Sequence, residues 1–407
     1  MPTTLFLALS FLREGRTQSA LISAAVGMGV AVIVFLSALI GGLQVDLLAK
    51  TLGTQPHVTV SRPEEQPRAL WADQEDGAIV LTRLEQAAQR QRGLTGWQQT
   101  LEDIERASGV EACSPVVAGP GFAVRGTVSK AINLIGIDPL RYDKVIDVRS
   151  RLVEGRMVRG GAEAAIGVEL ADSLGLSLGS KLRVQAAGGR TELFTVVGLF
   201  DMGNREVNER WVLTPMRAGQ TLLGQVGAIT RIEVRLPDPF EADEVAKALS
   251  GRTGLETESW MQTNGQLLAA LRSQSSSSTM IQVFVILSVT IGIASVLVVS
   301  VVQKRRQIGI LRAMGSSRGD IARIFLFQGG MLGVLGSVVG VALGAGVANL
   351  FRSVAVDDAG EPLFPILLDT QLMVTASVVA ISTGLIAALL PALRAAQLDP
   401  ADAIRHD

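Results

Sequence analysis

Four long stretches of the chain carry no charged side chain, and this pattern of hydrophobic positions sets the expected architecture. The stretches are Thr17–Val45, Ser273–Gln303, Ile324–Phe351 and Thr370–Leu393. A helix needs about 20 mostly apolar residues to cross the hydrocarbon core of a bilayer, and each stretch is longer than that. The pattern therefore predicts a membrane protein with four transmembrane α-helices.

The long segment between the first two apolar stretches has the composition of a water-soluble domain. Strand-like runs such as Lys181–Gln185 and Leu193–Phe200 alternate with helix-like runs such as Gly167–Leu174. Such a mixture predicts a large α+β domain between transmembrane helices 1 and 2. The expected segments are 1–45 (N-terminal helix and first span), 46–272 (the α+β domain), 273–303 (second span), 304–323 (connecting helix), 324–351 (third span), 352–369 (short loop), 370–393 (fourth span) and 394–407 (tail).

The connection between the second and third spans is strongly basic. Its only acidic residue is Asp320, against Lys304, Arg305, Arg306, Arg312, Arg318 and Arg323. Short loops rich in Lys and Arg stay on the cytoplasmic side of a membrane. Both termini are therefore expected in the cytoplasm, and segment 46–272 outside it. The basic end before the first span also fits a signal peptide, but the apolar run is too long for that and favours a retained anchor.

The same connection has the pattern of a short amphipathic helix. Apolar residues recur at helical spacing at Ile308, Leu311 and Met314, with Ile310 alongside. Gly315 is expected to end this helix, and Ser317-x-x-Asp320 has the spacing of a capping box that opens the next one. Two interpretations remain open: a helix lying in the lipid headgroups, or a helix that docks into another protein.

The segment that begins at Gln307 closely resembles the cytoplasmic loop of MacB/FtsX-type ABC transporter permeases. Its sequence is QIGILRAMGSSRGDIARIFLFQG. This resemblance extends over nearly the whole chain. It implies that 304–323 is a coupling helix contacting a separate ABC ATPase, which binds the ATP, so that this chain itself holds no cofactor. The coupling residues would be Ile308, Ile310, Leu311, Arg312 and Met314. One departure is Gln307, where the family commonly has Glu.

Within this family, the opening FLREGRTQSALISAAVGMGVAVIVFLSALIGGLQ and the later IFLFQGG are most similar to lipoprotein-releasing permeases of the LolC/LolE type. The resemblance implies a bacterial inner membrane, a periplasmic 46–272 domain, and a second permease copy or related permease as partner. A periplasmic carrier or adaptor is a further expected partner. Lipoprotein release or export of a lipophilic substrate is the expected function. The alternative is an FtsX-like scaffold that activates a periplasmic hydrolase.

The third span is rich in glycine on one side. Gly336, Gly340 and Gly344 follow one another at intervals of four, so they lie on one helix face. Small residues let helix backbones approach closely within a bilayer. This face is expected to pack against another helix, which belongs either to the same chain or to a partner permease.

Composition excludes several other kinds of function. The net charge is −1, which gives no basic field for nucleic acid. The single cysteine, Cys113, and two histidines, His57 and His406, form no metal-ligand spacing and make a histidine-based catalytic triad implausible. The run from Gly175 to Lys181 is one residue short of a phosphate-binding loop and is expected to be a turn. The chain is therefore expected to be a non-catalytic subunit without a metal.

Overall fold

The computed structural model describes residues 3–14, 16–63, 93–356 and 366–398. The chain divides into two compact units, Met1–Leu47 with Ala269–Asp407, and Leu48–Leu268. The middle of the predicted loop 352–369 and the end of the predicted tail 394–407 lie outside the described residues. The two units are described separately below.

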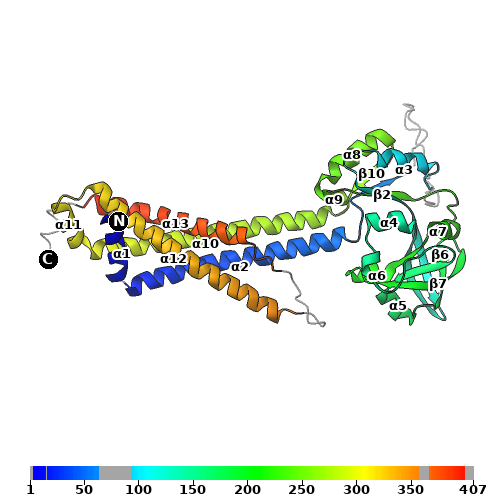
Figure 1. The fold of residues 1–407 in the computed structure, drawn as a ribbon, viewed down its shortest axis with the longest axis horizontal. Helices are drawn as coiled ribbons and strands as arrows, with labels where there is room; N and C mark the ends of the chain where they lie inside the picture. Colours follow the sequence, from blue (N-terminus) through cyan, green and yellow to red (C-terminus); the bar gives the residue numbers. More distant parts are fainter. Residues whose placement is uncertain (1–2, 15, 64–92, 357–365, 399–407) are drawn as a thin grey trace, which may run out of the picture. The chain divides into compact units, whose positions relative to one another are not determined.

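The first unit is built from helices (Figure 1). Among the described residues, four helices are long and apolar enough to cross a membrane: α2, α10, α12 and α13. Two shorter helices accompany them. The bounds are α1 Thr3–Glu14, α2 Arg16–Leu52, α10 Gly265–Gln303, α11 Arg305–Ala313, α12 Arg318–Val354 and α13 Thr370–Ala396.

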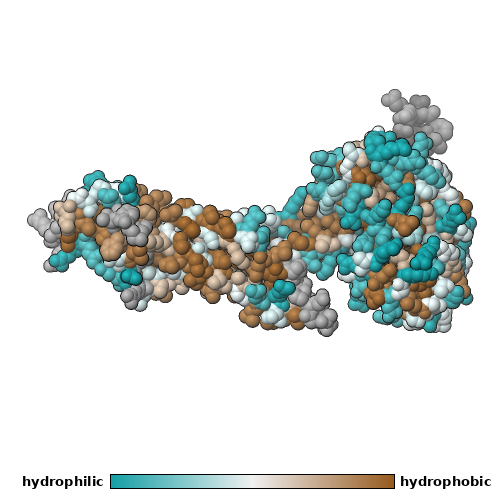
Figure 2. Space-filling model, viewed as in Figure 1, coloured by the Kyte–Doolittle hydropathy of each residue, from teal (hydrophilic) through white to brown (hydrophobic). Residues whose placement is uncertain are grey.

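Two apolar clusters hold these helices together. The first joins Val26 and Val30 of α2 to Leu297 of α10, Leu332 of α12 and Ala388 of α13. The second joins α1, α11, the start of α12 and the end of α13. Apolar side chains also cover much of the outer surface of these helices (Figure 2), as expected for helices that face lipid.

The second unit is an α+β domain. Its strands are β1 Val58–Ser61, β2 Ala112–Arg125, β3 Val128–Ile137, β4 Leu152–Gly155, β5 Glu163–Gly167, β6 Lys181–Ala186, β7 Thr191–Phe200, β8 Trp211–Pro215, β9 Arg231–Arg235 and β10 Glu256–Ser259. Its helices are α3 Trp97–Glu105, α4 Pro139–Val145, α5 Val168–Leu174, α6 Arg205–Arg210, α7 Met216–Leu223, α8 Ala242–Thr253 and α9 Trp260–Thr263, with 3-10 turns at Arg149–Arg151 (η1) and Pro239–Glu241 (η2).

The strands form one sheet whose order is β10-β1-β9-β2-β3-β8-β5-β7-β4. Strand β6 pairs with both β2 and β7, so β2, β3, β8, β5, β7 and β6 close into a ring of hydrogen-bonded strands. The side chains of β6 alternate strictly between exposed and buried, and the buried ones join Phe194 and Leu134 in the core of that ring. The long strand β2 also pairs with β9 at its start, which extends the sheet toward β1 and β10.

A second core lies under α3 and α8, and it contains Trp260, Ile104 and Leu249. Leu48 and Leu52 at the end of α2 and Leu268 near the start of α10 pack against this core. The predicted fold class is confirmed: four apolar helices, with an α+β domain between the first and second.

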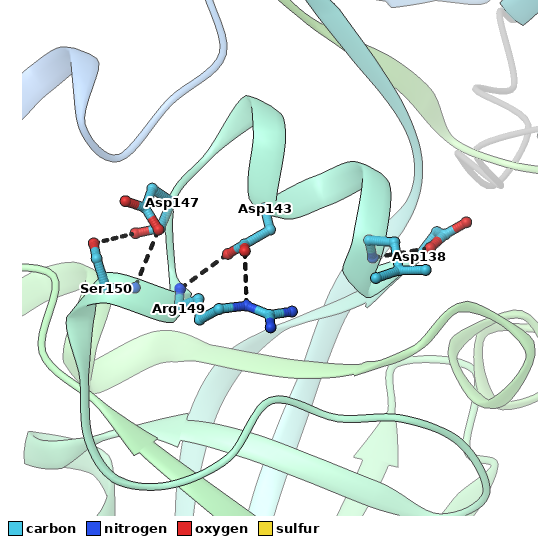
Figure 3. A network of polar contacts seen from close by, with 6 residues as sticks. Asp138, Asp143, Asp147, Arg149 and Ser150 are labelled. Atoms are coloured by element: carbon cyan, nitrogen blue, oxygen red, sulfur yellow. Dashed lines mark hydrogen bonds and ion pairs between the residues drawn. The ribbon is translucent and has the colours of Figure 1, made fainter.

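A chain of acidic caps fixes the connection from α4 to η1 (Figure 3). The Asp138 carboxylate accepts a hydrogen bond from the Leu140 N–H at the start of α4, which Pro139 begins. The Asp143 carboxylate accepts two bonds from Arg149, from its backbone N–H at 3.0 Å and its side chain at 2.9 Å. These contacts satisfy backbone groups locally and have the character of turn chemistry.

Candidate functional site

Helix α11 and the turn that follows it are defined by local sequence signals. Gly315 adopts φ +99°, a conformation that side chains disfavour, and the Ser316 N–H bonds back to the Leu311 carbonyl at 3.1 Å. Helix α12 then opens with a capping box. The Ser317 hydroxyl accepts from the Asp320 N–H at 3.1 Å, and the Asp320 carboxylate accepts from the Ser317 N–H at 3.2 Å. The predicted end of α11 and the predicted capping box are both confirmed.

One face of α11 packs into its own unit. Ile308 is fully buried in the cluster that contains Phe325 of α12 and Ala395 of α13, and Leu311 packs against that cluster half-buried. Ile308 is therefore already used inside this chain, and Leu311 is used in part.

Two other large apolar side chains, in α11 and at its C-cap, are exposed. Ile310 is 46% exposed and Met314 is 79% exposed, and they lie four residues apart, so they share a helix face. Arg305 and Arg306 are exposed on the same helix. Exposed apolar side chains beside cations fit both interpretations of α11, a helix in the lipid headgroups and a helix that docks into another protein.

Arg312 points inward to the carboxyl end of α13. Its guanidinium donates hydrogen bonds to the carbonyls of Ala396, at 3.2 Å, and Leu398. The last carbonyls of a helix lack partners within the helix and carry partial negative charge, so a cation there is favourable. Arg312 thereby ties α11 to the fourth span. The family resemblance placed Arg312 among the coupling residues. The carbonyls that it binds are more than 80 positions away, so local spacing does not predict this contact.

The glycine face of α12 meets α2 of the same chain. Gly336, Gly340 and Gly344 are all buried. A methyl group on Gly340 would lie 2.5 Å from the Val30 side chain and 2.6 Å from the Gly27 carbonyl oxygen. At Gly336 it would overlap Val26, and at Gly344 it would lie 3.0 Å from Val34. Of the two alternatives for this face, the structure shows the contact within the chain.

A second small-residue contact joins α12 to α13. Gly329 and Gly333 of α12 face Gly384, Ala388 and Ala380 of α13 at distances that leave no room for a larger side chain. Helix α12 thus has close backbone contacts on two sides. Close contact without large side chains is how helices associate in lipid, where both surroundings are equally apolar.

The other candidates from the sequence have structural roles. Cys113 is buried, and burial raises the pKa of its thiol to about 12, so it is not a reactive thiolate. The Gly175–Lys181 run is the turn from α5 to β6, in which the Ser177 N–H bonds to the Ser180 hydroxyl at 3.1 Å. No group of three or more metal-ligating side chains occurs among the residues that the structure describes.

The fold and the basic turn define a class of membrane permease. Residues 19–252 match the MacB-like periplasmic core domain family, and residues 279–400 match the FtsX-like permease C-terminal family. Because the first match covers more than half of the 407 residues, the chain belongs to the MacB-like periplasmic core domain family. It is an ABC transporter permease of the LolC/MacB type, with FtsX-like permease helices at its C-terminal end.

Named relatives match between about half and nearly all of the chain. The lipoprotein-releasing system transmembrane protein LolC of Neisseria meningitidis serogroup B is 24% identical, over 94% of this chain and 93% of that protein. LolE of the same kind of system in Haemophilus influenzae is 23% identical, over 76% of this chain and 80% of that protein. The crystal structure of the periplasmic region of MacB from Actinobacillus actinomycetemcomitans is 14% identical, with a TM-score of 0.34, and covers 54% of this chain and 95% of that one.

Proposed function

We propose that the chain is the membrane subunit of a complex in which a separate ABC ATPase supplies the energy. Motion of the ATPase is passed through α11 to the four spans and from them to the α+β domain. The work done outside the cytoplasm is release of a lipoprotein, or export of a lipophilic substrate. Two relatives covering most of their own length carry the name of a lipoprotein-releasing system, which supports transport over activation of a hydrolase.

The observation that carries the proposal is the exposed pair Ile310 and Met314. A large apolar side chain that enters a groove on a partner gains about 1.5–3 kcal/mol relative to exposure. A short amphipathic helix offering apolar anchors four residues apart is a recurrent mode of protein recognition. Ile308 anchors α11 in the apolar cluster, and Arg312 bonds it to the end of α13, so the position of the exposed pair is fixed.

The orientation follows from charge. The turn that carries α11 is rich in Arg, so it lies in the cytoplasm, where an ATPase finds its nucleotide. With four spans, both termini then lie in the cytoplasm of a bacterium, and segment 46–272 lies in the periplasm across the inner membrane.

The complex also contains a second permease, either another copy or a related chain. LolC and LolE are both named as transmembrane proteins of a lipoprotein-releasing system, which supports a paired arrangement. Much of α10 is exposed, so this span remains available for lipid or a second permease. A periplasmic carrier that receives the product completes the proposed set of partners.

The test is purification of the tagged chain from the membranes of its own organism, followed by identification of the proteins that accompany it. The expected result is an ABC ATPase and a second permease in fixed ratio. ATP added to membranes containing this complex should release a lipoprotein into the soluble fraction, and a variant of the ATPase that cannot hydrolyse ATP should abolish the release. A chain that purifies without any ATPase contradicts the proposal.

A further inference from the structure

A polar cavity of about 240 Å³ lies among the end of α1, the first turns of α2, the last turns of α10, the start of α11 and the third turn of α12. Amides and hydroxyls make up half of its lining residues, and the rest are one ammonium, one carboxylate and four apolar side chains. The residues that matter here are Glu14, Gln18, Ser300, Lys304, Gln307 and Gln328. All of them belong to the first unit. The cavity is separate from the exposed pair on α11, and the inference drawn from it does not depend on the proposed function.

Gln328 is the reason to expect a ligand in this cavity. Its side chain is 4% exposed, and among the described residues no donor lies within hydrogen-bond distance of its Oε1 atom. A buried acceptor without a donor costs free energy that a folded protein normally avoids. Gln328 is also one of the residues that line the cavity, so an occupant of that space can supply the missing donor.

The rim of the cavity carries both signs of charge. The Lys304 ammonium lies 2.7 Å from the Glu14 carboxylate and 4.0 Å from the centre of the Phe11 ring. Lys304 follows directly after the apolar α10, and Glu14 directly precedes the start of α2 in the described residues. Charges at the ends of spans mark the level of the lipid headgroups. The cavity thus opens at headgroup level, and Gln328 lies inside it.

We propose that this cavity binds the headgroup of a phospholipid that carries a primary ammonium, as phosphatidylethanolamine does. The lipid phosphate would accept hydrogen bonds from Lys304 and from the amide of Gln18 or Gln307. The lipid ammonium would donate one to Gln328 Oε1 and pair with Glu14. The cavity therefore supplies a cation for the phosphate, and an anion and a buried acceptor for the ammonium.

This chemistry separates ethanolamine from the other common headgroups. A choline headgroup has the same charges but no N–H, so it leaves Gln328 Oε1 without a donor. A glycerol headgroup has hydroxyl donors but no cation to pair with Glu14. Water fills a polar cavity of this size and donates hydrogen bonds too, so a preference among headgroups is the property that distinguishes a lipid site from a hydrated cavity.

The experiment uses the full chain, stripped of lipid in detergent, and measures binding of lipids with identical acyl chains by native mass spectrometry and by thermal shift. Phosphatidylethanolamine should bind about tenfold more tightly than phosphatidylcholine, and more tightly than phosphatidylglycerol. Gln328→Leu should abolish the preference over phosphatidylcholine, because it removes the acceptor. Lys304→Gln should weaken binding of both lipids. Gln371→Leu, the same change at an exposed position of α13, should alter neither.

Equal binding of the ethanolamine and choline lipids overturns the proposal and leaves the cavity to water. Equal binding of phosphatidylglycerol overturns the assignment of the ammonium. Glycerophosphoethanolamine, which has no acyl chains, tests whether the ligand is a lipid or a soluble phosphate ester. If it stabilises the protein while the lipid does not, the ligand is a soluble phosphate ester and the lipid assignment fails. If Gln328→Leu does not fold, the lipid series on the unaltered chain and on Lys304→Gln still decides the outcome.

Discussion

The buried side chain of His57 makes the stability of the α+β domain depend on pH. It is 8% exposed, and its Nδ1 accepts a hydrogen bond from the Leu236 N–H at 3.1 Å. Burial, aided by the nearby Arg235 charge, lowers the pKa of this imidazole. Below about pH 6.5, the usual value for histidine, the unfolded chain binds a proton that the folded chain refuses, so stability is lost as pH falls.

The melting temperature of the domain should therefore fall as pH is lowered from 7.5 through 6.5 to 5.5. His57→Asn should reduce this dependence, because the asparagine amide keeps an acceptor and cannot titrate. Glu163 does not contribute in this pH range. Its hydrogen bond with Arg156 lowers the pKa of its carboxyl to about 2. The stability that this carboxylate gives the folded protein is therefore lost only below about pH 4.5. An unchanged pH slope in His57→Asn would show that another group controls it.

Arg312, one of the predicted coupling residues, links α11 to the end of α13. Arg312→Ala removes the hydrogen bonds to the carbonyls of Ala396 and Leu398, so α11 and α13 lose one of their links. For a half-buried cation at a helix end the expected cost is about 1 kcal/mol. The detergent-solubilised protein should melt at a lower temperature, and Arg318→Ala, at an exposed position, should not change it. If both variants melt alike, the link contributes nothing to stability.

Features that depend on neighbouring residues could be predicted from the sequence, and contacts between distant residues could not. Gly315 and the Ser317–Asp320 box act within a few residues, so spacing alone predicts them. Helix α11 carries apolar side chains on more than one side, and only the position of Phe325 and Ala395 decides that Ile308 is buried while Met314 is exposed. No pattern within the helix contains that information.

At the scale of elements, the seam between α2 and α12 makes the sharpest claim. Gly340→Leu forces a side chain into Val30 and the Gly27 carbonyl, whereas Gly346 of the same helix has open space around it. Overpacking of this kind costs about 1–3 kcal/mol, while Gly346→Leu should stay within about 0.5 kcal/mol. Both variants should insert into the membrane, because leucine is apolar.

Thermal unfolding of the two leucine variants in detergent measures the difference. Gly340→Leu should melt at a clearly lower temperature than Gly346→Leu. Equal melting temperatures would mean that the α2–α12 contact is loose enough to accept a leucine, and that the seam does not hold the spans together.

The spans and the fold class could be predicted because apolar length is a strong signal that needs no partner. Strand β6 was also predicted, since its alternation is strict. Strands β5 and β8 were not predicted, and the backbone partners of both include distant parts of the chain. The short helices α4, α6 and α7 were not predicted, although α5, of similar length, was.

At the scale of the whole molecule, the proposed orientation places Val226 and Met314 on opposite sides of the membrane. Their exposed fractions, 78% and 79%, are nearly equal, so a single cysteine at either position should react equally well with a reagent that reaches it. In a Cys113→Ala background, an impermeant thiol reagent applied to spheroplasts should label Val226→Cys and spare Met314→Cys. After permeabilisation and removal of the bound ATPase both should be labelled. The reverse pattern in intact spheroplasts contradicts the orientation.

The most direct test of the account is the affinity of the co-purifying ATPase for the permease with and without the exposed pair on α11. The double variant Ile310→Asp with Met314→Asp removes two apolar anchors, each worth about 1.5–3 kcal/mol, so the dissociation constant should rise by at least about 100-fold. Gly319→Asp adds a carboxylate at an exposed position in the first turn of α12, where it is tolerated, and should leave the affinity unchanged. Thermal unfolding should show that all three proteins are folded. An affinity that stays at the original value in the double variant contradicts the claim that α11 couples this permease to its ATPase.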